Sequence, residues 1–264
     1  MEILAYIASV LIGISLGLIG GGGSILTVPV LVYMFGISPL LSTSYSLFIV
    51  GSTSLIGAFS SYKKGAVSVR TALLFGASSI TTVFVTRKFL IPLIPKQLFK
   101  IGDFQVTEPI LTMILFALLM MAASFGMINS DAQKTKYPEK AGDNYIKLFV
   151  FGVGIGLTTG LLGAGGGFLL IPTLVLLLGM PMKKAVGTSL LIIALNSLIG
   201  FAGDIGHFEI DWPFLLRITG IAIAGIVFGG MIGKYINSDQ LKKGFGWFIL
   251  LMGIYIITHE IIAL

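Results

Sequence analysis

Two glycine-rich segments have the residue types and spacing best suited to binding a ligand. Residues 18–29 read LIGGGGSILTVP, and residues 161–172 read LLGAGGGFLLIP. Glycine inside a helix costs about 1 kcal/mol relative to alanine, so each run favours a break in its helix. A helix that restarts after a break presents unpaired N–H groups at the positive end of its dipole. The expected chemistry is therefore non-covalent binding of a small anion by backbone amides.

Hydroxyl side chains follow each glycine segment and could add donors to such a site. Several stand three or four residues apart and can share a helix face, although many Ser and Thr side chains in membrane helices bond only their own backbone. The predicted substrate-binding residues are Gly20, Gly21, Gly22, Gly23, Ser24, Ser46, Gly163, Gly165, Gly166, Gly167, Thr188 and Ser189. Pro29 and Pro172 are predicted to mark the helix break or hinge. The alternative for the glycines is close helix packing through small residues.

The acidic residues nearest the apolar segments are expected to lie outside the site. Asp204, His207, Glu209 and Asp211 cluster between two apolar segments, where a solvated outer loop is predicted. A proton relay is the alternative, because a histidine beside carboxylates titrates near neutral pH. The anion would then be held by helix dipoles, amides and hydroxyls rather than by a buried Arg or Lys.

Several other kinds of chemistry are disfavoured by what the sequence lacks. There is no cysteine and there are only two histidines, which excludes thiolate metal sites and argues against a multi-histidine metal centre. No HExxH motif and no paired carboxylate within an apolar segment supports an intramembrane enzyme. No metal or cofactor is expected. The net charge of +6 is explained by basic cytoplasmic loops rather than by a nucleic-acid partner.

The elements that must position these residues are membrane-spanning helices. Hydrophobic residues make up 56% of the chain and charged residues 11%, against about 25% charged in soluble domains. Apolar blocks cover residues 3–35, 40–60, 69–94, 107–128, 147–179, 185–203, 212–236 and 244–263. Most reach the roughly 20 residues that a span requires, and their backbone groups must be satisfied within helices. The first block is expected to belong to the mature protein, because Glu2 stands where a signal peptide would be positive.

The chain is also an internal duplication. The two glycine segments align at an offset of 143 residues, and the residues Ser54-Leu55-Ile56-Gly57 recur as Ser197-Leu198-Ile199-Gly200 at the same offset. We therefore predict a first transmembrane repeat at 1–128, a linker at 129–144 and a second repeat at 145–264. Each repeat has four apolar blocks, the first of them broken by glycines as a discontinuous or re-entrant helix.

Counting basic residues distinguishes two topologies. Inverted repeats place twelve Lys and Arg residues on the linker side and five on the other, whereas parallel repeats divide them eight to nine. The five are Arg87, Lys88, Lys96, Lys100 and Arg217. Since cytoplasmic loops are enriched in Lys and Arg, we predict an all-α polytopic protein of two inverted repeats. The linker is then cytoplasmic and both termini lie outside, with either three or five crossings per repeat.

These motifs resemble a known family. The segments GGGGSILTVPVLVY and GAGGGFLLIPTLVLLLG, followed by STSYSLFIVGSTSLIGAF and AVGTSLLIIALNSLIGFAGD, are similar to the TauE/SafE sulfite exporter family over nearly the whole chain. The resemblance implies a transporter of the bacterial inner membrane whose substrates are sulfite, sulfonates and related organosulfur anions. Carried over by motif, it assigns binding to the glycine segments with Pro29, Pro172, Thr188 and Ser189.

The function predicted from the sequence is secondary transport of a small sulfur-containing oxyanion, in the export direction. Alternating access would move the two halves about a central site between the glycine-broken helices. The expected partners are the anionic substrate and the lipid bilayer; a coupling proton and an oligomeric assembly are left open. The alternatives are an anion channel and a transporter of a different small anion.

Overall fold

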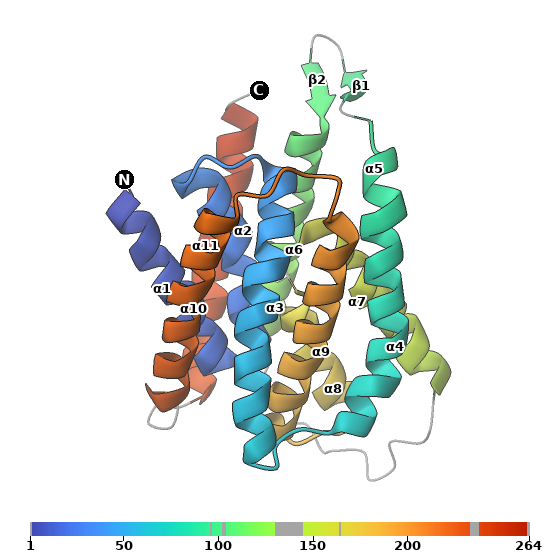
Figure 1. The fold of residues 1–264 in the computed structure, drawn as a ribbon, viewed down its shortest axis with the longest axis vertical. Helices are drawn as coiled ribbons and strands as arrows, with labels where there is room; N and C mark the ends of the chain where they lie inside the picture. Colours follow the sequence, from blue (N-terminus) through green and yellow to red (C-terminus); the bar gives the residue numbers. More distant parts are fainter. Residues whose placement is uncertain are drawn as a thin grey trace.

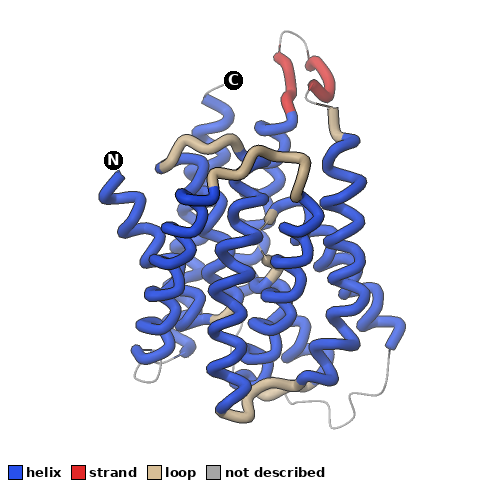
Figure 2. Tube along the Cα trace, viewed as in Figure 1, coloured by secondary structure: helices blue, strands red, loops and turns tan. Residues whose placement is uncertain are grey.

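The architecture is taken from a computed structural model that describes residues 2–95, 97–101, 104–129, 145–163, 165–232 and 238–262. The predicted linker lies outside the described residues from residue 130 to residue 144. Helices make up nearly all of the described part of both halves (Figure 2).

The helices of the first half are α1 (Glu2–Ile19), the 3₁₀ helix η1 (Gly21–Leu26), α2 (Thr27–Pro29), the π turn η2 (Val30–Met34), α3 (Pro39–Lys63), α4 (Val69–Val85), the π turn η3 (Thr86–Leu90), α5 (Ile91–Leu93) and α6 (Glu108–Asn129). Those of the second half are α7 (Tyr145–Leu162), α8 (Gly167–Leu178), α9 (Met182–Asp204), α10 (Trp212–Ile232) and α11 (Ser238–Ile262). At the 143-residue offset, α1 corresponds to α7, α3 to α9 and α4 to α10.

The lengths of these helices suit a membrane. Among the described residues, five helical stretches are long and apolar enough to cross a bilayer: Pro39–Lys63, Val69–Leu93, Pro109–Gly126, Met182–Asp204 and Trp212–Ile232. Large apolar side chains on their outer faces are exposed, among them Phe59, Leu73 and Phe228. Because such surface is stable against acyl chains and not against water, the chain is a multi-pass helical membrane protein.

Two helices form the centre of the bundle. In α3 and α9, 61% and 67% of the most apolar stretch of the helix is buried, against 28% in α6 and 39% in α10. Figure 1 shows α3 and α9 side by side and running in opposite directions, with the other helices around them. The two central helices therefore link one half to the other.

The halves contact each other in a reciprocal way. The backbone N–H of Ser68, before α4, donates to Oγ1 of Thr188 in α9 at 2.9 Å. The N–H of Asp211, before α10, donates to the hydroxyl of Tyr45 in α3 at 2.7 Å. The donors are 143 residues apart, and so are the acceptors. Each half thus supplies to the other the contact that it receives.

Apolar contacts follow the same rule. A Cβ added at Gly57 would meet the side chain of Leu190, and one added at Gly200 would meet Leu47, which is the same contact with the halves exchanged. These two glycines let α3 and α9 pack closely at two places along their length.

One short hairpin departs from the all-helical expectation. Strands β1 (Gln97–Ile101) and β2 (Phe104–Thr107) pair antiparallel, with Gln97 opposite Thr107. The hairpin extends beyond the bundle between α5 and α6 (Figures 1 and 2). The Gly102-Asp103 dipeptide between two short apolar runs is a hairpin signal that the sequence offered.

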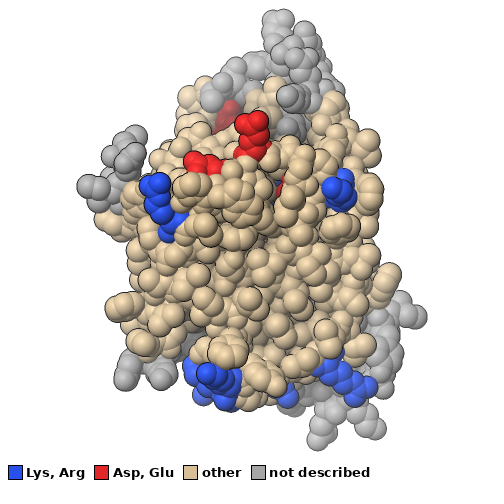
Figure 3. Space-filling model, in the orientation of Figure 1, with Lys and Arg blue, Asp and Glu red and all other residues tan. Residues whose placement is uncertain are grey.

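Charge divides the surface into a lateral belt and two ends. Figure 3 shows a lateral surface almost without charges. Basic side chains gather at the end where α3 finishes and α9 begins, which is the location of Lys63, Lys64, Lys183 and Lys184. The acidic side chains in this view lie at the opposite end.

Candidate functional site

The first glycine segment interrupts the chain between two helices. Helix α1 ends at Ile19, Gly20 takes the left-handed value φ 73°, and η1 begins at Gly21. Gly20 has no Cβ, so this conformation is accessible to it at little cost. Ser24 does not cap the new helix, because its hydroxyl donates to the carbonyl of Gly21 within η1 at 2.7 Å. Gly22 also lies within η1.

The second glycine segment makes a longer turn. Helix α7 ends at Leu162 and α8 begins at Gly167. Gly163, Gly165 and Gly166 have φ values of 67°, 66° and 66°. Gly166 is the N-cap of α8 and makes no side-chain capping hydrogen bond, so the first N–H groups of α8 receive no side-chain acceptor there.

The two segments meet inside the protein. Gly21 at the start of η1 lies against Gly167 at the start of α8, backbone to backbone, because a Cβ added to either would overlap the other residue. Gly163 lies against the backbone of Thr43, and its carbonyl accepts a hydrogen bond of 2.7 Å from the hydroxyl of Ser46. We call the two segments on either side of the contact between Gly21 and Gly167, which are Gly20–Ser24 and Gly163 with Gly165–Gly167, the glycine junction.

Unpaired hydroxyls border the glycine junction. The hydroxyl of Ser197 in α9 lies 3.4 Å from the position that a Cβ of Gly165 would take. The hydroxyl of Thr159 in α7 lies against Gly166. Both side chains are completely buried and neither hydroxyl has a hydrogen-bond partner. Since buried polar groups are normally paired, these hydroxyls indicate a place for a polar ligand or for water.

Helix α9 also carries a buried amide next to Ser197 in the sequence. Asn196, next to Ser197 in α9, donates from Nδ2 to the hydroxyl of Ser79 in α4 at 2.6 Å, and its Oδ1 has no partner. Ser54, which corresponds to Ser197 in the first half, is also buried and unpaired. Asn196, Ser197 and Ser54 were not among the predicted site residues, although all were visible as polar positions within apolar segments.

The remaining predicted residues have different partners. Gly20 packs against the side chain of Val186, and the hydroxyl of Ser189, one turn further along α9, donates to the Val186 carbonyl at 2.8 Å. Thr188 accepts the hydrogen bond from the loop before α4. The structure therefore brings Gly21 into contact with Gly167 and Ser46 into contact with Gly163, while the hydroxyl of Thr188 accepts a hydrogen bond from the loop before α4.

The prolines do not themselves break the helices. Pro29 ends α2 and is followed directly by the π turn η2, so the chain stays helical there. Helix α8 runs without interruption from Gly167 to Leu178 and includes Pro172. The interruptions between helices lie at the glycines with positive φ values, and the chain is helical at Pro29 and Pro172.

A buried ion pair corrects the expected positions of Arg87 and Asp204. Arg87, which was counted among the outer-side charges, is completely buried in η3. Its Nη1 lies 3.2 Å from Oδ2 of Asp204, which was expected in a solvated loop and is instead buried at the end of α9. The other three residues of the acidic cluster, His207, Glu209 and Asp211, are exposed as expected. The signal for this pair was an arginine several residues inside the apolar block 69–94.

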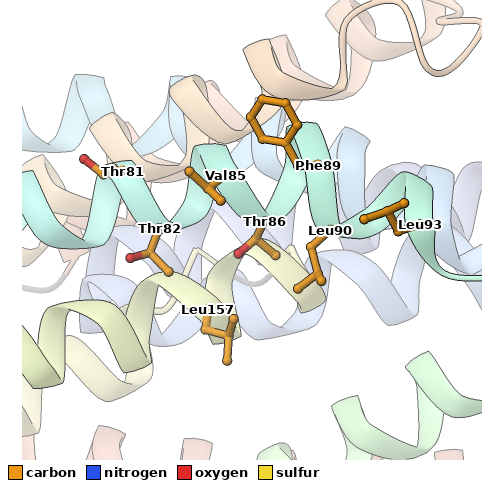
Figure 4. A pocket seen from close by; sticks show the side chains of 8 residues that line it. All are labelled: Thr81, Thr82, Val85, Thr86, Phe89, Leu90, Leu93 and Leu157. Atoms are coloured by element: carbon orange, nitrogen blue, oxygen red, sulfur yellow. The ribbon is translucent and has the colours of Figure 1, made fainter.

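A separate pocket of about 360 Å³ lies on the side of the bundle. Figure 4 shows its lining residues, which belong to α4, η3, α5 and α7: Thr81, Thr82, Val85, Thr86, Phe89, Leu90, Leu93 and Leu157. The Thr81 and Thr82 hydroxyls bond to carbonyls of their own helix. The pocket is therefore apolar and offers no charged group for an anion.

Comparison with known proteins places the chain in a family. The family described as sulfite exporter TauE/SafE matches residues 5–256. The chain belongs to this family, and the predicted resemblance is confirmed.

Curated relatives cover nearly the same length. A probable membrane transporter protein of Xylella fastidiosa strain 9a5c is 26% identical over 95% of this chain and 92% of its own length. The probable membrane transporter protein YunE of Bacillus subtilis strain 168 is 28% identical over 91% of each chain. No solved structure gives a significant match. The protein is thus a membrane transporter of the TauE/SafE family.

Proposed function

We propose that the protein is a secondary transporter that exports a small sulfur-containing oxyanion, such as sulfite or a sulfonate, across the cytoplasmic membrane. The substrate class rests on the name of the family, which covers almost the whole chain. The residues support it because the proposed site suits a small anion that must be released again.

The observation that carries the proposal is the meeting of Gly21 with Gly167 at the starts of η1 and α8. Two helix starts that face one region concentrate backbone N–H groups and the positive ends of two helix dipoles. Ser197 and Thr159 supply unpaired hydroxyls beside them. Such a site attracts an oxyanion through many weak donors, and none of these donors carries a full charge that would prevent release.

We further propose that the halves are inverted repeats that alternate access to the glycine junction. The reciprocal hydrogen bonds of Ser68 with Thr188 and of Asp211 with Tyr45 support a twofold relation between the halves. The corresponding helices α3 and α9 run in opposite directions, which supports a twofold axis that lies in the plane of the membrane (Figure 1). Rocking of one half against the other would open the junction first to one side and then to the other.

The orientation follows from the charges. The end of the bundle that carries Lys63, Lys64, Lys183 and Lys184 would face the cytoplasm, because cytoplasmic ends are enriched in Lys and Arg. The end near both termini would face outward (Figure 1). In each half, the helix after the glycine segment would bring the chain back to the side of the membrane from which the helix before it started. The linker would be cytoplasmic.

The test is flux in proteoliposomes that contain the purified protein. We expect sulfite uptake that saturates, is inhibited by methanesulfonate and is accelerated by sulfite on the opposite side of the membrane. Liposomes without protein and proteoliposomes with the Gly154→Ala variant serve as controls, because a Cβ at Gly154 meets no atom within 4 Å.

Other outcomes would be informative in different ways. Uptake that does not saturate and is not accelerated by counter-substrate would indicate a channel. Saturable uptake of another anion, with none of sulfite or of simple sulfonates, would refute the substrate assignment and leave the carrier mechanism standing.

A further inference from the structure

The buried pair of Arg87 and Asp204 is more than a link between helices. Nη1 of Arg87 lies 3.2 Å from Oδ2 of Asp204, and both side chains are 0% exposed. Removing two ions from water costs several kcal/mol each unless their remaining hydrogen-bonding groups are also satisfied. Here they are not, because Nε and Nη2 of Arg87 and Oδ1 of Asp204 form no hydrogen bond with any residue that the structure describes. The contact therefore leaves part of the desolvation cost uncompensated.

The free donors of Arg87 have a specific geometry. Nε and Nη2 form the side edge of the guanidinium, where two N–H groups point in parallel. This edge matches two oxygens of one oxyanion, whereas Asp204 occupies the other end of the group through Nη1 alone. Ser44 in α3 lies close enough for its buried hydroxyl to interact with the Asp204 carboxylate, although the two groups do not meet in a well-formed hydrogen bond. Three helices thus contribute unpaired polar atoms to one place.

The local backbone is built to bring Arg87 inside. Arg87 lies in the π turn η3, and such turns are frequent at functional sites because they change which side chains face the core. Gly203 permits the approach, since a Cβ there would lie 3.1 Å from the Arg87 Cβ. A larger residue at 203 would push η3 away from α9.

The pair has no counterpart in the other half. At the 143-residue offset, Arg87 corresponds to Gly230, and Asp204 corresponds to Ser61. The twofold relation that duplicates the glycine junction therefore does not duplicate this pair. It lies toward the end of the bundle where α9 ends and α5 follows η3 (Figure 1), which is the outward end in the proposed orientation.

We propose that Arg87 is a second oxyanion-binding residue, on the exit side of the glycine junction. Its Nε and Nη2 donate to two oxygens of the departing anion, while Asp204 holds the guanidinium in place through Nη1. The identity of the anion rests on the proposed function. A halide can accept from both N–H groups only at its single centre, whereas an oxyanion places one oxygen on each of the two parallel donors, so the site favours sulfite, sulfonates and carboxylates over chloride.

The experiment measures anion binding by the purified protein through the fluorescence of Trp212. The Trp212 ring packs against that of Phe201, with the ring centroids 6.0 Å apart, and Phe201 lies about one turn before Asp204 in α9. The Trp247→Phe substitution removes the other tryptophan, so the signal comes from Trp212. Arg87→Lys keeps the charge and removes the parallel donors. We expect sulfite to bind at least about tenfold more weakly to this variant. Arg217→Lys, at an exposed arginine of α10, is the matched control and should bind as the wild type does.

A double variant separates binding from folding. Arg87→Gln alone would leave Asp204 buried without a partner, so Arg87→Gln is combined with Asp204→Asn, which removes both charges and keeps the net charge. We expect this variant to melt near the wild-type temperature and to lose sulfite binding by at least about tenfold. Sulfite binding unchanged in both Arg87→Lys and the double variant would overturn the inference.

A panel of sulfite, methanesulfonate, acetate and chloride distinguishes the two proposals. If the wild type binds acetate through Arg87 but neither binds nor transports sulfite or methanesulfonate, the proposed function fails and the Arg87 site stands. If sulfite is transported and the Arg87 variants bind it as the wild type does, the proposal for Arg87 is refuted and the proposed transport function stands. Equal competition by chloride and sulfite at matched concentrations would also contradict the Arg87 site.

Discussion

The two glycine segments share a sequence pattern and differ in backbone. In the first, Gly20 alone has a positive φ and the chain continues at once as the 3₁₀ helix η1. In the second, Gly163, Gly165 and Gly166 are all left-handed, and the regular helix α8 begins only at Gly167. The second segment thus reaches a full helix N-terminus, while the first reaches a tighter helix with poorer hydrogen-bond geometry.

This difference implies that the half-sites contribute unequally to binding. An α-helix N-terminus aligns more N–H groups with its dipole than a six-residue 3₁₀ helix does. The unpaired hydroxyls of Thr159 and Ser197 also lie against the second segment. The second half would therefore hold the anion more strongly, and the first would complete the enclosure. Four predictions test this comparison.

The largest effect is expected where the segments touch. Gly167→Ala places a methyl group on the backbone of Gly21, and neither backbone can move aside cheaply. We expect sulfite transport to fall by at least about a hundredfold, since small displacements of a binding geometry can cost that much. The control is Gly154→Ala in α7, where an added Cβ meets no atom within 4 Å, and it should transport sulfite at the wild-type rate. A Gly167→Ala protein that elutes as a single species and transports at the wild-type rate would show that the junction is not the site.

The next prediction separates backbone strain from contact. Gly163→Ala and Gly36→Ala both put alanine at a positive φ, 67° and 68°. The conformation alone costs between about 1 and 2 kcal/mol. Gly36 has no atom within 4 Å of an added Cβ, whereas that of Gly163 would overlap Thr43. We expect the midpoint of thermal unfolding to fall further for Gly163→Ala. Equal midpoints would mean that the second segment can relax away from α3.

The third prediction compares hydroxyls that correspond between the halves. Ser197→Ala removes a donor beside Gly165, and Ser54→Ala removes its counterpart. A hydrogen bond to a charged group contributes about 1.5 to 3 kcal/mol, so we expect sulfite affinity to fall about ten- to a hundredfold for Ser197→Ala. The fall should be smaller for Ser54→Ala, and melting temperatures should not drop because both hydroxyls are unpaired. Equal losses of affinity would indicate a symmetric site.

The smallest effect tests the relation between the halves. Tyr45→Phe and Thr188→Val each remove the acceptor for one loop N–H, of Asp211 and Ser68 respectively. Each should lower the free energy of unfolding by about 1 kcal/mol, by similar amounts, because the two contacts correspond. Unfolding by denaturant in detergent micelles measures both. A loss confined to one variant would show that the halves are not equivalent in packing.

Much of the fold could be predicted from the chain alone. Apolar composition predicted membrane-spanning helices, and the 143-residue offset predicted which helices correspond. The glycine runs predicted interruptions near Gly20 and Gly163, because only glycine takes positive φ at little cost. The hairpin at 97–107 was missed, because short strands outside a bundle leave a weak signal beside long apolar blocks.

The candidate site could be predicted only in part. The glycines and Ser46 were predicted from their type and position, and the structure places the Ser46 hydroxyl on the carbonyl of Gly163. Thr188 and Ser189 were predicted because their hydroxyls follow the second glycine segment, but which face of α9 meets which helix depends on packing. On that helix the unpaired hydroxyl of Ser197 lies beside Gly165, while Asn196 bonds to Ser79 in α4.

The sequence by itself determined that this is a helical membrane protein, because hydropathy is a local property, and its glycine runs predicted where helices would be interrupted, because backbone freedom is local too. The tertiary structure decided that Gly21 meets Gly167, and that Arg87 is buried against Asp204, 117 residues away. Contacts across such a separation depend on how α4, α8 and α9 pack together. An arginine that looks like a loop charge in the sequence becomes a buried anion donor only when a second helix covers it.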